Sequence, residues 1–453
     1  MTIRMGSTLW RRGIAVAAAV VAVAVGIGGW TAPDEKEAVP PRPRTTTVPL
    51  TPGTPAPTAP ACPNDPEAAA APPPALVAAL QQALAGFPDV TVGVSMWVEG
   101  YGEVLASGAD VPLSPASVQK VFTAMGALSL FEPDDAFTTA VRAIGPVAGG
   151  VLRGDLVLVG GGDPTLTARG PHSLDTLAVQ VRQAGITSVA GSVVADESRH
   201  DAARAAPGWQ GWQQPAYVGP MSALMVDDNR RRTDPGYLAS PATGNAEVFR
   251  AALAAHGVAV APRVVAGTAP PGASEVASLS SRPVPELVTE MLQRSDNETA
   301  ELLAREAGLE AGTAGSTPSG TAALTASLRP LCVPLAGVAD DGSGLSRADR
   351  RTAREWRQLL EAATSQPWGA RFRDSLPLAG RSGTLAGRFR GTPAEGNVRA
   401  KTGTIIGGRS LAGYLTTAGG RPAVFAIVVN GEASRASQRA IDHLVVTLAG
   451  DRS

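Results

Sequence analysis

Lysine is scarce in this chain. Of its 39 basic residues only three are lysines, Lys36, Lys120 and Lys401, and the rest are arginines. A guanidinium group keeps its charge in proteins, whereas a buried ammonium group can lose its proton. Lys36 lies in a low-complexity stretch, so Lys120 and Lys401 are the two lysines for which the sequence suggests a chemical role.

Net charge, aromatic residues, histidine and cysteine are also limited. The net charge is −1 and aromatics make up 4% of the chain, with no basic tract, so nothing indicates nucleic-acid binding. Four scattered histidines and two isolated cysteines give no metal-ligand spacing, and neither a metal nor an organic cofactor is implied. Cys62 and Cys332 could form one disulfide outside the cytoplasm or remain two thiols, and both alternatives stay open. No Gly-x-Ser-x-Gly string is present, which disfavours an ordinary Ser-His-Asp hydrolase.

The N-terminal 30 residues are typical of an export signal. Arginines at positions 4, 11 and 12 precede an uncharged run of 18 residues from Gly13 to Trp30. This run is near the lower limit of the ~17–25 residues that span a membrane. We expect residues 1–30 to be a signal peptide or an N-terminal membrane anchor. An uncleaved anchor is favoured because no convincing A-x-A cleavage site follows, and either alternative places the body outside the cytoplasm.

Proline dominates the next segment. Residues 31–75 contain 14 of the 38 prolines, mixed with threonine and alanine. Such a composition cannot build a hydrophobic core. We therefore predict that residues 31–74 form an extended, semi-rigid spacer; a plain disordered linker would differ only in stiffness.

The remaining sequence predicts an α+β body interrupted by an insertion. Residues 139–275 contain short β-branched runs between Gly/Pro turns, which indicate an inserted, mostly β domain. Residues 75–138 and 276–453 would together form the main domain. Its predicted helices lie at about 75–85, 114–130, 285–308, 348–363 and 434–449, and its predicted strands at 90–98, 104–106, 411–417 and 422–429.

The first chemically informative motif is Ser-Val-Gln-Lys at 117–120. Ser114-Pro115 is a plausible N-cap and first turn for a helix that continues to about Leu130. Three residues apart on one helix face, Ser117 and Lys120 lie close enough for the amine to contact the hydroxyl. A desolvated lysine with a lowered pKa can activate a serine nucleophile.

Two further motifs follow in the sequence. Ser-Asp-Asn at 295–297 lies between two predicted helices, where its simplest interpretation is a helix cap. Lys-Thr-Gly-Thr at 401–404 ends an extended segment, where its simplest interpretation is a surface strand. Gly403 would let a peptide substrate lie against the strand edge. Ser-x-x-Lys, Ser-Asp-Asn and Lys-Thr-Gly in this order are the signature of class A β-lactamases and penicillin-binding proteins.

Longer strings narrow this resemblance. Pro-Ala-Ser-Val-Gln-Lys at 115–120, Gly-Gly-Asp-Pro-Thr-Leu at 161–166, Asp-Gly-Ser-Gly-Leu-Ser-Arg at 341–347 and the segment 378–404 resemble the low-mass, class C penicillin-binding proteins. These are serine D-Ala-D-Ala carboxypeptidases and endopeptidases. The resemblance covers about residues 75–450 and implies a serine β-lactamase/penicillin-binding-protein (transpeptidase-like) fold. It also implies peptidoglycan stem peptides as substrates and β-lactam antibiotics as covalent inhibitors.

The resemblance assigns a role to each motif residue. Ser117 would be the nucleophile and Lys120 its general base. Ser295 would relay a proton to the leaving D-alanine, and Asn297 would position the substrate amide. Lys401, Thr402 and Thr404 would hold the substrate carboxylate, next to Gly403. The backbone N–H groups of Ser117 and Thr404 would form the oxyanion hole.

One feature departs from the family and several functions compete. The family usually carries two extra domains between the first two motifs, but the gap from Ser117 to Ser295 leaves room for one full domain and a reduced or absent second. The nearest alternatives are endopeptidase action at the same site, a β-lactamase, and a non-catalytic wall-binding protein. A β-lactamase would need a second base, and no Glu-x-x-Leu-Asn string is present.

Overall fold

The computed structural model describes residues 70–231, 236–431 and 435–453. The predicted signal or anchor and nearly all of the predicted spacer lie outside the described residues. Within the described ranges, no helix has the length and apolar character needed to cross a membrane. Cys332 is disulfide-bonded, which excludes a free thiol at this position, and Cys62 lies outside the described residues.

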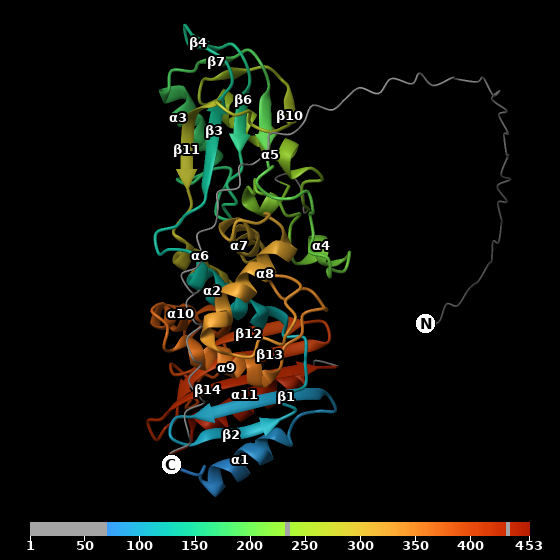
Figure 1. The fold of residues 1–453 in the computed structure, drawn as a ribbon, viewed down its shortest axis with the longest axis vertical. Coiled ribbons are helices and arrows are strands. Elements are labelled where there is room, and N and C mark those ends of the chain that lie inside the picture. Colours follow the sequence, from blue (N-terminus) through green and yellow to red (C-terminus); the bar gives the residue numbers. More distant parts are fainter. Residues whose placement is uncertain (1–69, 232–235, 432–434) are drawn as a thin grey trace, which may run out of the picture. The chain divides into compact units, whose positions relative to one another are not determined.

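The main body is organised around a five-stranded antiparallel sheet with strand order β12-β13-β14-β1-β2 (Figure 1). Strands from the two ends of the chain form its centre, since Thr91 of β1 pairs with Asn430 of β14. Strand β12, which carries the Lys-Thr-Gly motif, is an edge strand. The strands are β1 (Thr91–Val98), β2 (Gly102–Ser107), β12 (Arg399–Ile405), β13 (Gly408–Thr416) and β14 (Pro422–Asn430).

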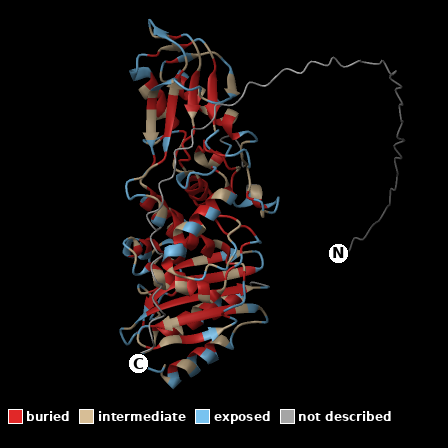
Figure 2. Cartoon of the chain, in the orientation of Figure 1, coloured by how far each residue is buried: buried red, intermediate tan, exposed pale blue. Residues whose placement is uncertain are grey.

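Both faces of this sheet are covered by helices, as the buried residues along β14 in Figure 2 illustrate. Phe425 and Ile427 join one hydrophobic core, while Ala426 and Val428 join the other, because successive side chains of a strand point to opposite faces. Helices α1 (Pro74–Leu84) and α11 (Arg435–Ala449) contribute to the first core. The second core contains α2 (Gln119–Leu130), α6 (Val284–Arg294), α7 (Asn297–Glu310), α8 (Thr317–Leu328), α9 (Ala353–Ala363) and α10 (Gly369–Ser375).

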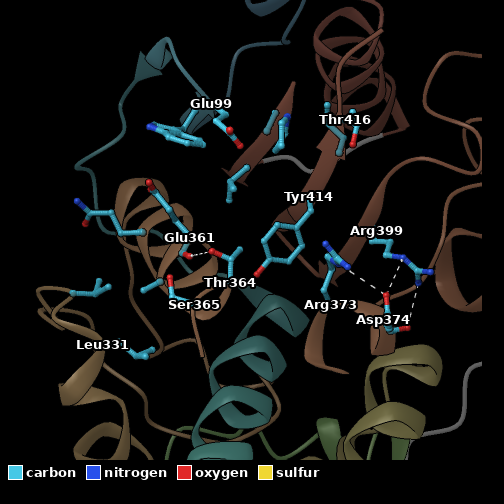
Figure 3. A pocket seen from close by; sticks show the side chains of 18 of the residues that line it. Glu99, Leu331, Glu361, Thr364, Ser365, Arg373, Asp374, Arg399, Tyr414 and Thr416 are labelled. Carbon is cyan, nitrogen blue, oxygen red and sulfur yellow. Dashed lines mark hydrogen bonds and ion pairs between the residues drawn. The ribbon is translucent and has the colours of Figure 1, made fainter. Parts of the chain in front are cut away.

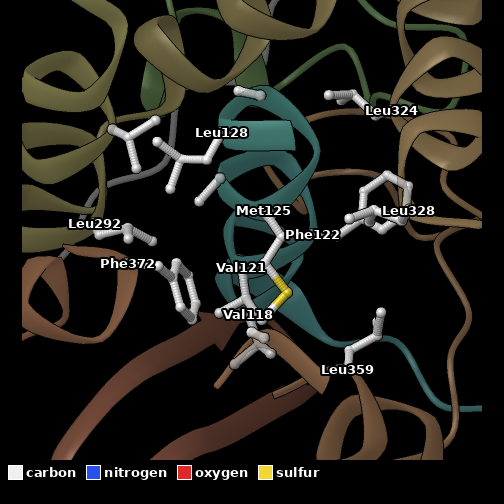
Figure 4. Packing of buried hydrophobic residues seen from close by; sticks show 14 of the residues in the cluster. Val118, Val121, Phe122, Met125, Leu128, Leu292, Leu324, Leu328, Leu359 and Phe372 are labelled. Atoms are coloured by element: carbon white, nitrogen blue, oxygen red, sulfur yellow. The ribbon is translucent and has the colours of Figure 1, made fainter. Parts of the chain in front are cut away.

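Helix α2 is the central helix of the second core. All of its residues from Gln119 to Leu128 are buried, as expected for a helix surrounded by other elements. Figure 4 shows Phe122 and Met125 packed among side chains from several neighbouring segments. A Cβ atom on Gly126 would lie 2.6 Å from Leu324 Cδ2, so α2 and α8 approach closely at this point. The predicted catalytic serine and lysine therefore lie at the start of a helix that is fixed by packing.

The segment between the first two motifs contains two further sheets. One has the order β10-β8-β6-β3-β11, with β6, β8 and β10 parallel, and the other is a small sheet β4-β5-β7-β9. Helices α3 (Leu174–Gln183) and α5 (Pro241–Ala255) pack with the larger sheet in a separate hydrophobic core. The strands are β3 (Thr138–Ala143), β4 (Val147–Ala148), β5 (Val151–Leu152), β6 (Leu156–Val159), β7 (Ser188–Val189), β8 (Val193–Asp196), β9 (Ala259–Val260), β10 (Val264–Ala266) and β11 (Ser274–Ser280).

The sequence predicted the main-body strands well but missed five helices of the described residues, α3, α4 (Gln213–Ala216), α5, α8 and α10. Helix α3 has the sequence LDTLAVQVRQ, in which valine and threonine lower the helix propensity, although Leu174, Leu177, Ala178 and Val181 have helical spacing and are buried. Tertiary burial of that face overrides the local preference. The domain boundaries at residues 138/139 and 275/276 stay predictions.

Candidate active site

Ser117 lies in a short 3-10 turn, Ala116–Val118, that leads directly into α2. The prediction that Ser114 caps this helix is wrong. The turn begins after Pro115 without a side-chain cap, and Ser114 Oγ has no hydrogen-bond partner within the described part of the chain. Ser114 is instead fixed through its backbone N–H, which donates to Asn430 Oδ1 at 2.8 Å. Strand β14 therefore positions the start of the serine turn.

The residue before Ser117 has a strained backbone. Ala116 has φ = 50°, a left-handed value that is uncommon for a residue other than glycine. The loop at Gly344 packs against it so closely that a Cβ atom there would lie 1.9 Å from Ala116 O. Such strain persists only where surrounding contacts impose it, and it is typical of functional sites.

Lys120 has three acceptors from three parts of the chain. Its Nζ lies 3.3 Å from Ser117 Oγ, 2.6 Å from Asn297 Oδ1 and 2.6 Å from the carbonyl oxygen of Ser343. The side chain is fully buried, and burial lowers its pKa to about 8, although the negative charges of Asp341 and Glu301 act in the opposite direction. Lys120 can therefore lose its proton in the physiological range.

The Ser-Asp-Asn motif connects α6 to α7. Ser295 ends α6 in the left-handed conformation, with φ = 59°. Asp296 is the N-cap of α7, and its Oδ1 accepts from the N–H of Thr299 at 2.7 Å. Asn297 directs its Oδ1 to Lys120 and donates through Nδ2 to Tyr217 O at 2.8 Å. Asp296 therefore has the helix-capping role, while the adjacent Asn297 has the contact with Lys120 that the functional interpretation predicts.

Lys401 completes the group from the edge strand β12. Its Nζ donates to Ser295 Oγ at 2.8 Å and to the carbonyl oxygen of Thr402 at 2.9 Å. The side chain is fully buried, and burial together with the neighbouring charge of Lys120 lowers its pKa well below the usual lysine range. Two lysines whose protonation states are coupled therefore face the two serines.

Gly403 permits a close approach between β12 and a neighbouring segment. Substrate access to the strand edge at this glycine stays a prediction. A Cβ atom would lie 1.9 Å from Ser410 Oγ and 2.6 Å from Pro115 O. Glycine is required because β12 packs directly against the segment that precedes Ser117.

A cavity of about 520 Å³ opens at these residues. Its lining includes Ser117, Ser295, Thr402, Gly403 and Thr404, so the predicted serines and the end of the Lys-Thr-Gly-Thr motif share one space. In the described ranges, no group of three or more His, Cys, Asp or Glu residues has the arrangement of a metal site.

A larger hollow of about 930 Å³ lies elsewhere, on the α9 side of the sheet (Figure 3). Tyr414, Glu361 and the Arg373–Asp374–Arg399 group line it, and it contains no motif residue. The smaller cavity is therefore the candidate active site. The string 341–347 resembles the family, but the sequence does not reveal that the Ser343 carbonyl contacts Lys120, because no residue type marks a backbone oxygen.

The fold and the site define a penicillin-binding serine enzyme. The solved structure of penicillin binding protein 4 from Haemophilus influenzae matches with a TM-score of 0.74 at 22% identity, over 81% of this chain and 98% of that chain. The chain belongs to the D-Ala-D-Ala carboxypeptidase 3 (S13) family, whose model matches residues 76–236 and 237–450.

Curated relatives agree with this family. A carboxypeptidase from Mycolicibacterium smegmatis is 33% identical over 98% of each chain. A D-alanyl-D-alanine carboxypeptidase from Actinomadura sp. is 32% identical over 77% of this chain and 79% of its own. The predictions of family, fold class and enzyme class are confirmed: the protein is a serine-type D-Ala-D-Ala carboxypeptidase. Since the family acts on the cell wall, the enzyme acts outside the cytoplasm.

Replacing Gly403 by alanine should damage both stability and activity. The new methyl group must displace the Pro115 backbone or Ser410, and overpacking of this kind typically costs about 1–3 kcal/mol. We expect a lower melting temperature and slower release of D-alanine from a D-Ala-D-Ala peptide. Gly211→Ala is the control, because a Cβ atom there meets nothing within 4 Å. Unchanged stability and activity in Gly403→Ala would contradict this account of the close approach.

Proposed function

We propose that Ser117 attacks the peptide carbonyl between the two D-alanines and forms an acyl-enzyme, with Lys120 as its general base. The distance of 3.3 Å from Lys120 Nζ to Ser117 Oγ is the observation that carries this proposal. Burial of Lys120 supports it, since a neutral amine is needed to accept the hydroxyl proton. The start of α2 contributes a dipole that favours negative charge near Ser117.

The substrate itself prepares the base. Burial and the charge of Lys120 both disfavour the charged form of Lys401 and lower its pKa. A carboxylate that binds beside Lys401 favours the charged form there. The charge on Lys401 then lowers the proton affinity of Lys120, so that Lys120 is neutral when the substrate is in place. The two lysines titrate as a pair, and an observed pKa belongs to both.

The other motif residues act on the two ends of the scissile bond. Ser295, hydrogen-bonded to Lys401, relays a proton to the leaving D-alanine. Asn297 positions the substrate amide and keeps Lys120 in place. Thr402 and Thr404 assist Lys401 in holding the terminal carboxylate, and both line the cavity.

The backbone N–H groups of Ser117 and Thr404 form the proposed oxyanion hole. Both residues border the cavity of about 520 Å³, from the serine turn and from β12 respectively. Donors of this kind stabilise the tetrahedral intermediate, and loss of one typically costs about 10²–10³-fold in rate. The close approach that Gly403 permits sets the spacing between these two segments.

Peptidoglycan stem peptides are the proposed substrates and β-lactams the proposed covalent inhibitors. A solved structure of the Haemophilus influenzae protein is described as a complex with a novel β-lactam, with a TM-score of 0.69 to this chain. The family and the curated relatives are carboxypeptidases, so endopeptidase action is not favoured. No Glu-x-x-Leu-Asn string supplies a second base, which disfavours the β-lactamase alternative.

Incubation of the full chain with benzylpenicillin tests the nucleophile. We expect the intact mass to increase by one penicillin and the adduct to persist, because deacylation is slow without a second base. Ser117→Ala should give no adduct, while Ser129→Ala, an exposed serine on the same helix, should behave like the wild type. An unmodified wild-type protein with hydrolysed penicillin would instead establish a β-lactamase.

The acylation rate should increase with pH through the apparent pKa of the lysine pair. The neutral form of Lys120 is the base, and its pKa of about 8 leaves most molecules protonated at neutral pH. Below that value each pH unit should change the rate about tenfold, with a plateau above it. Second-order rate constants of penicillin acylation from about pH 6 to about pH 10 measure this, because they report the protonation state of the free enzyme. Lys120→Arg should remain inactive across this range because guanidinium does not lose its proton; a flat wild-type profile would exclude Lys120 as the base.

We further propose that the run from Gly13 to Trp30 remains as an uncleaved membrane anchor and that residues 31–74 separate it from the catalytic body. No convincing A-x-A cleavage site follows this run, which supports the proposal. The protein purified from membranes should then keep its N-terminal residues in an N-terminal peptide analysis and resist extraction with carbonate. A mature N-terminus after Trp30 would identify a cleaved signal peptide.

A further inference from the structure

A buried carboxyl group lies next to Lys120 and has no part in the mechanism described so far. Glu301 is on α7, four residues after Asn297 and therefore on the same face of the helix. Its side chain is fully buried. Its Oε1 accepts hydrogen bonds from two successive backbone N–H groups, those of Gly342 at 3.1 Å and Ser343 at 2.9 Å.

These N–H groups belong to the loop that supplies an acceptor to Lys120. The Ser343 carbonyl accepts a hydrogen bond from Lys120 Nζ at 2.6 Å, the same distance as that from Lys120 Nζ to Asn297 Oδ1. The orientation of a backbone carbonyl depends on the hydrogen bonds that hold its own peptide group and the neighbouring ones. Glu301 binds the peptide on the N-terminal side of Ser343 and the peptide before that one.

The rest of the loop is held by other groups. Asp341 accepts from the N–H groups of Gly344 at 2.6 Å and Ser346 at 2.7 Å, and from Trp209 Nε1 at 2.8 Å. Helix α2 contributes through Thr123 Oγ1, which donates to Gly342 O at 2.6 Å. Asp341 thus holds the peptide that contains the Ser343 carbonyl, through the N–H of Gly344, while Glu301 holds the two peptides before it, through the N–H groups of Gly342 and Ser343.

We propose that Glu301 is a positioning residue for the acylation step: through the backbone of Gly342 and Ser343 it directs the Ser343 carbonyl towards Lys120 Nζ, and so aims the amine at Ser117. This inference rests on the proposed role of Lys120 as general base. Glu301 does not contact the reacting atoms; it acts through the loop.

A neutral carboxyl group is sufficient for this task. The charged groups that face Glu301 are Asp341, Arg305 and Lys120, and Asp341 in turn adjoins the buried Asp349. Burial and the negative charge of Asp341 raise the pKa of Glu301 to about 8. Its Oε2 has no hydrogen-bond partner within the described ranges, so nothing there stabilises a second negative oxygen. The amide oxygen of a glutamine could accept the same two N–H bonds.

Two variants of the full chain distinguish the hydrogen-bond acceptor of Glu301 from the volume of its side chain. Glu301→Gln keeps an acceptor at the same place, and we expect its plateau rate of benzylpenicillin acylation to stay within about threefold of wild type. Glu301→Met fills similar space with an adaptable side chain but cannot accept these bonds. Its plateau rate should fall by about tenfold or more, the range seen when a supporting group is removed from a reactive centre. The midpoint of its pH profile should move to lower pH, because the ammonium form of Lys120 loses a directed acceptor.

Glu306→Gln is the matched control, a buried carboxyl on the same helix that binds His200 at 2.6 Å and Arg199, away from the cavity. It should lower the melting temperature without changing the acylation rate or the midpoint. An unchanged rate and midpoint in Glu301→Met, or an equal loss in Glu301→Gln, would overturn the positioning role. If Glu301→Met does not fold, a tenfold loss in Glu301→Gln alone would overturn it, and a near-wild-type rate would support it. Failure of the wild type to acylate would refute the proposed function instead.

Discussion

The removal of two lysine side chains from water is the constraint on which the rest of the site depends. Lys120 and Lys401 are both fully buried. Removing an ammonium group from water costs several kcal/mol of desolvation free energy unless other groups compensate for it. The structure meets this with neutral acceptors rather than direct ion pairs: serine hydroxyls, an asparagine amide and backbone carbonyls. Neutral acceptors hold the nitrogen in place yet allow the proton to leave, which a carboxylate in direct contact would oppose.

This arrangement requires three other chain segments to hold the serine turn in place. The serine turn is held by β14 through Asn430, by β12 at Gly403 and by the loop at Gly344. Two of these contacts are possible only because glycine lacks a Cβ atom. The strained backbone of Ala116 is maintained by the same contacts. Close packing therefore fixes the distances between Ser117, Lys120 and the strand β12 that borders the cavity, which the proposed mechanism requires.

The segment between the first two motifs is bonded directly to the catalytic helix α7. Tyr217 O accepts from Asn297, the N–H of Gly219 donates to Glu298, and His200 with Arg199 contacts Glu306. These contacts extend along α7 from its first turn to its third. Through Tyr217 and Gly219 the insertion therefore contacts the first turn of α7, where Asn297 lies.

The sequence by itself determined the chemistry of this protein. The scarcity of lysine and the order of three short motifs pointed to two serines that line one cavity and to the two lysines and the asparagine bonded beside them, because catalysis requires particular side-chain types. Hydrophobic periodicity predicted the central strands and most main-body helices. Only the tertiary structure decided the left-handed turn at Ser295, the inward-facing side of Gly403, the failure of Ser114 to cap and the contact of Ser343 with Lys120. These depend on contacts between segments more than 100 residues apart and on backbone atoms, which every residue type shares and no sequence pattern can distinguish.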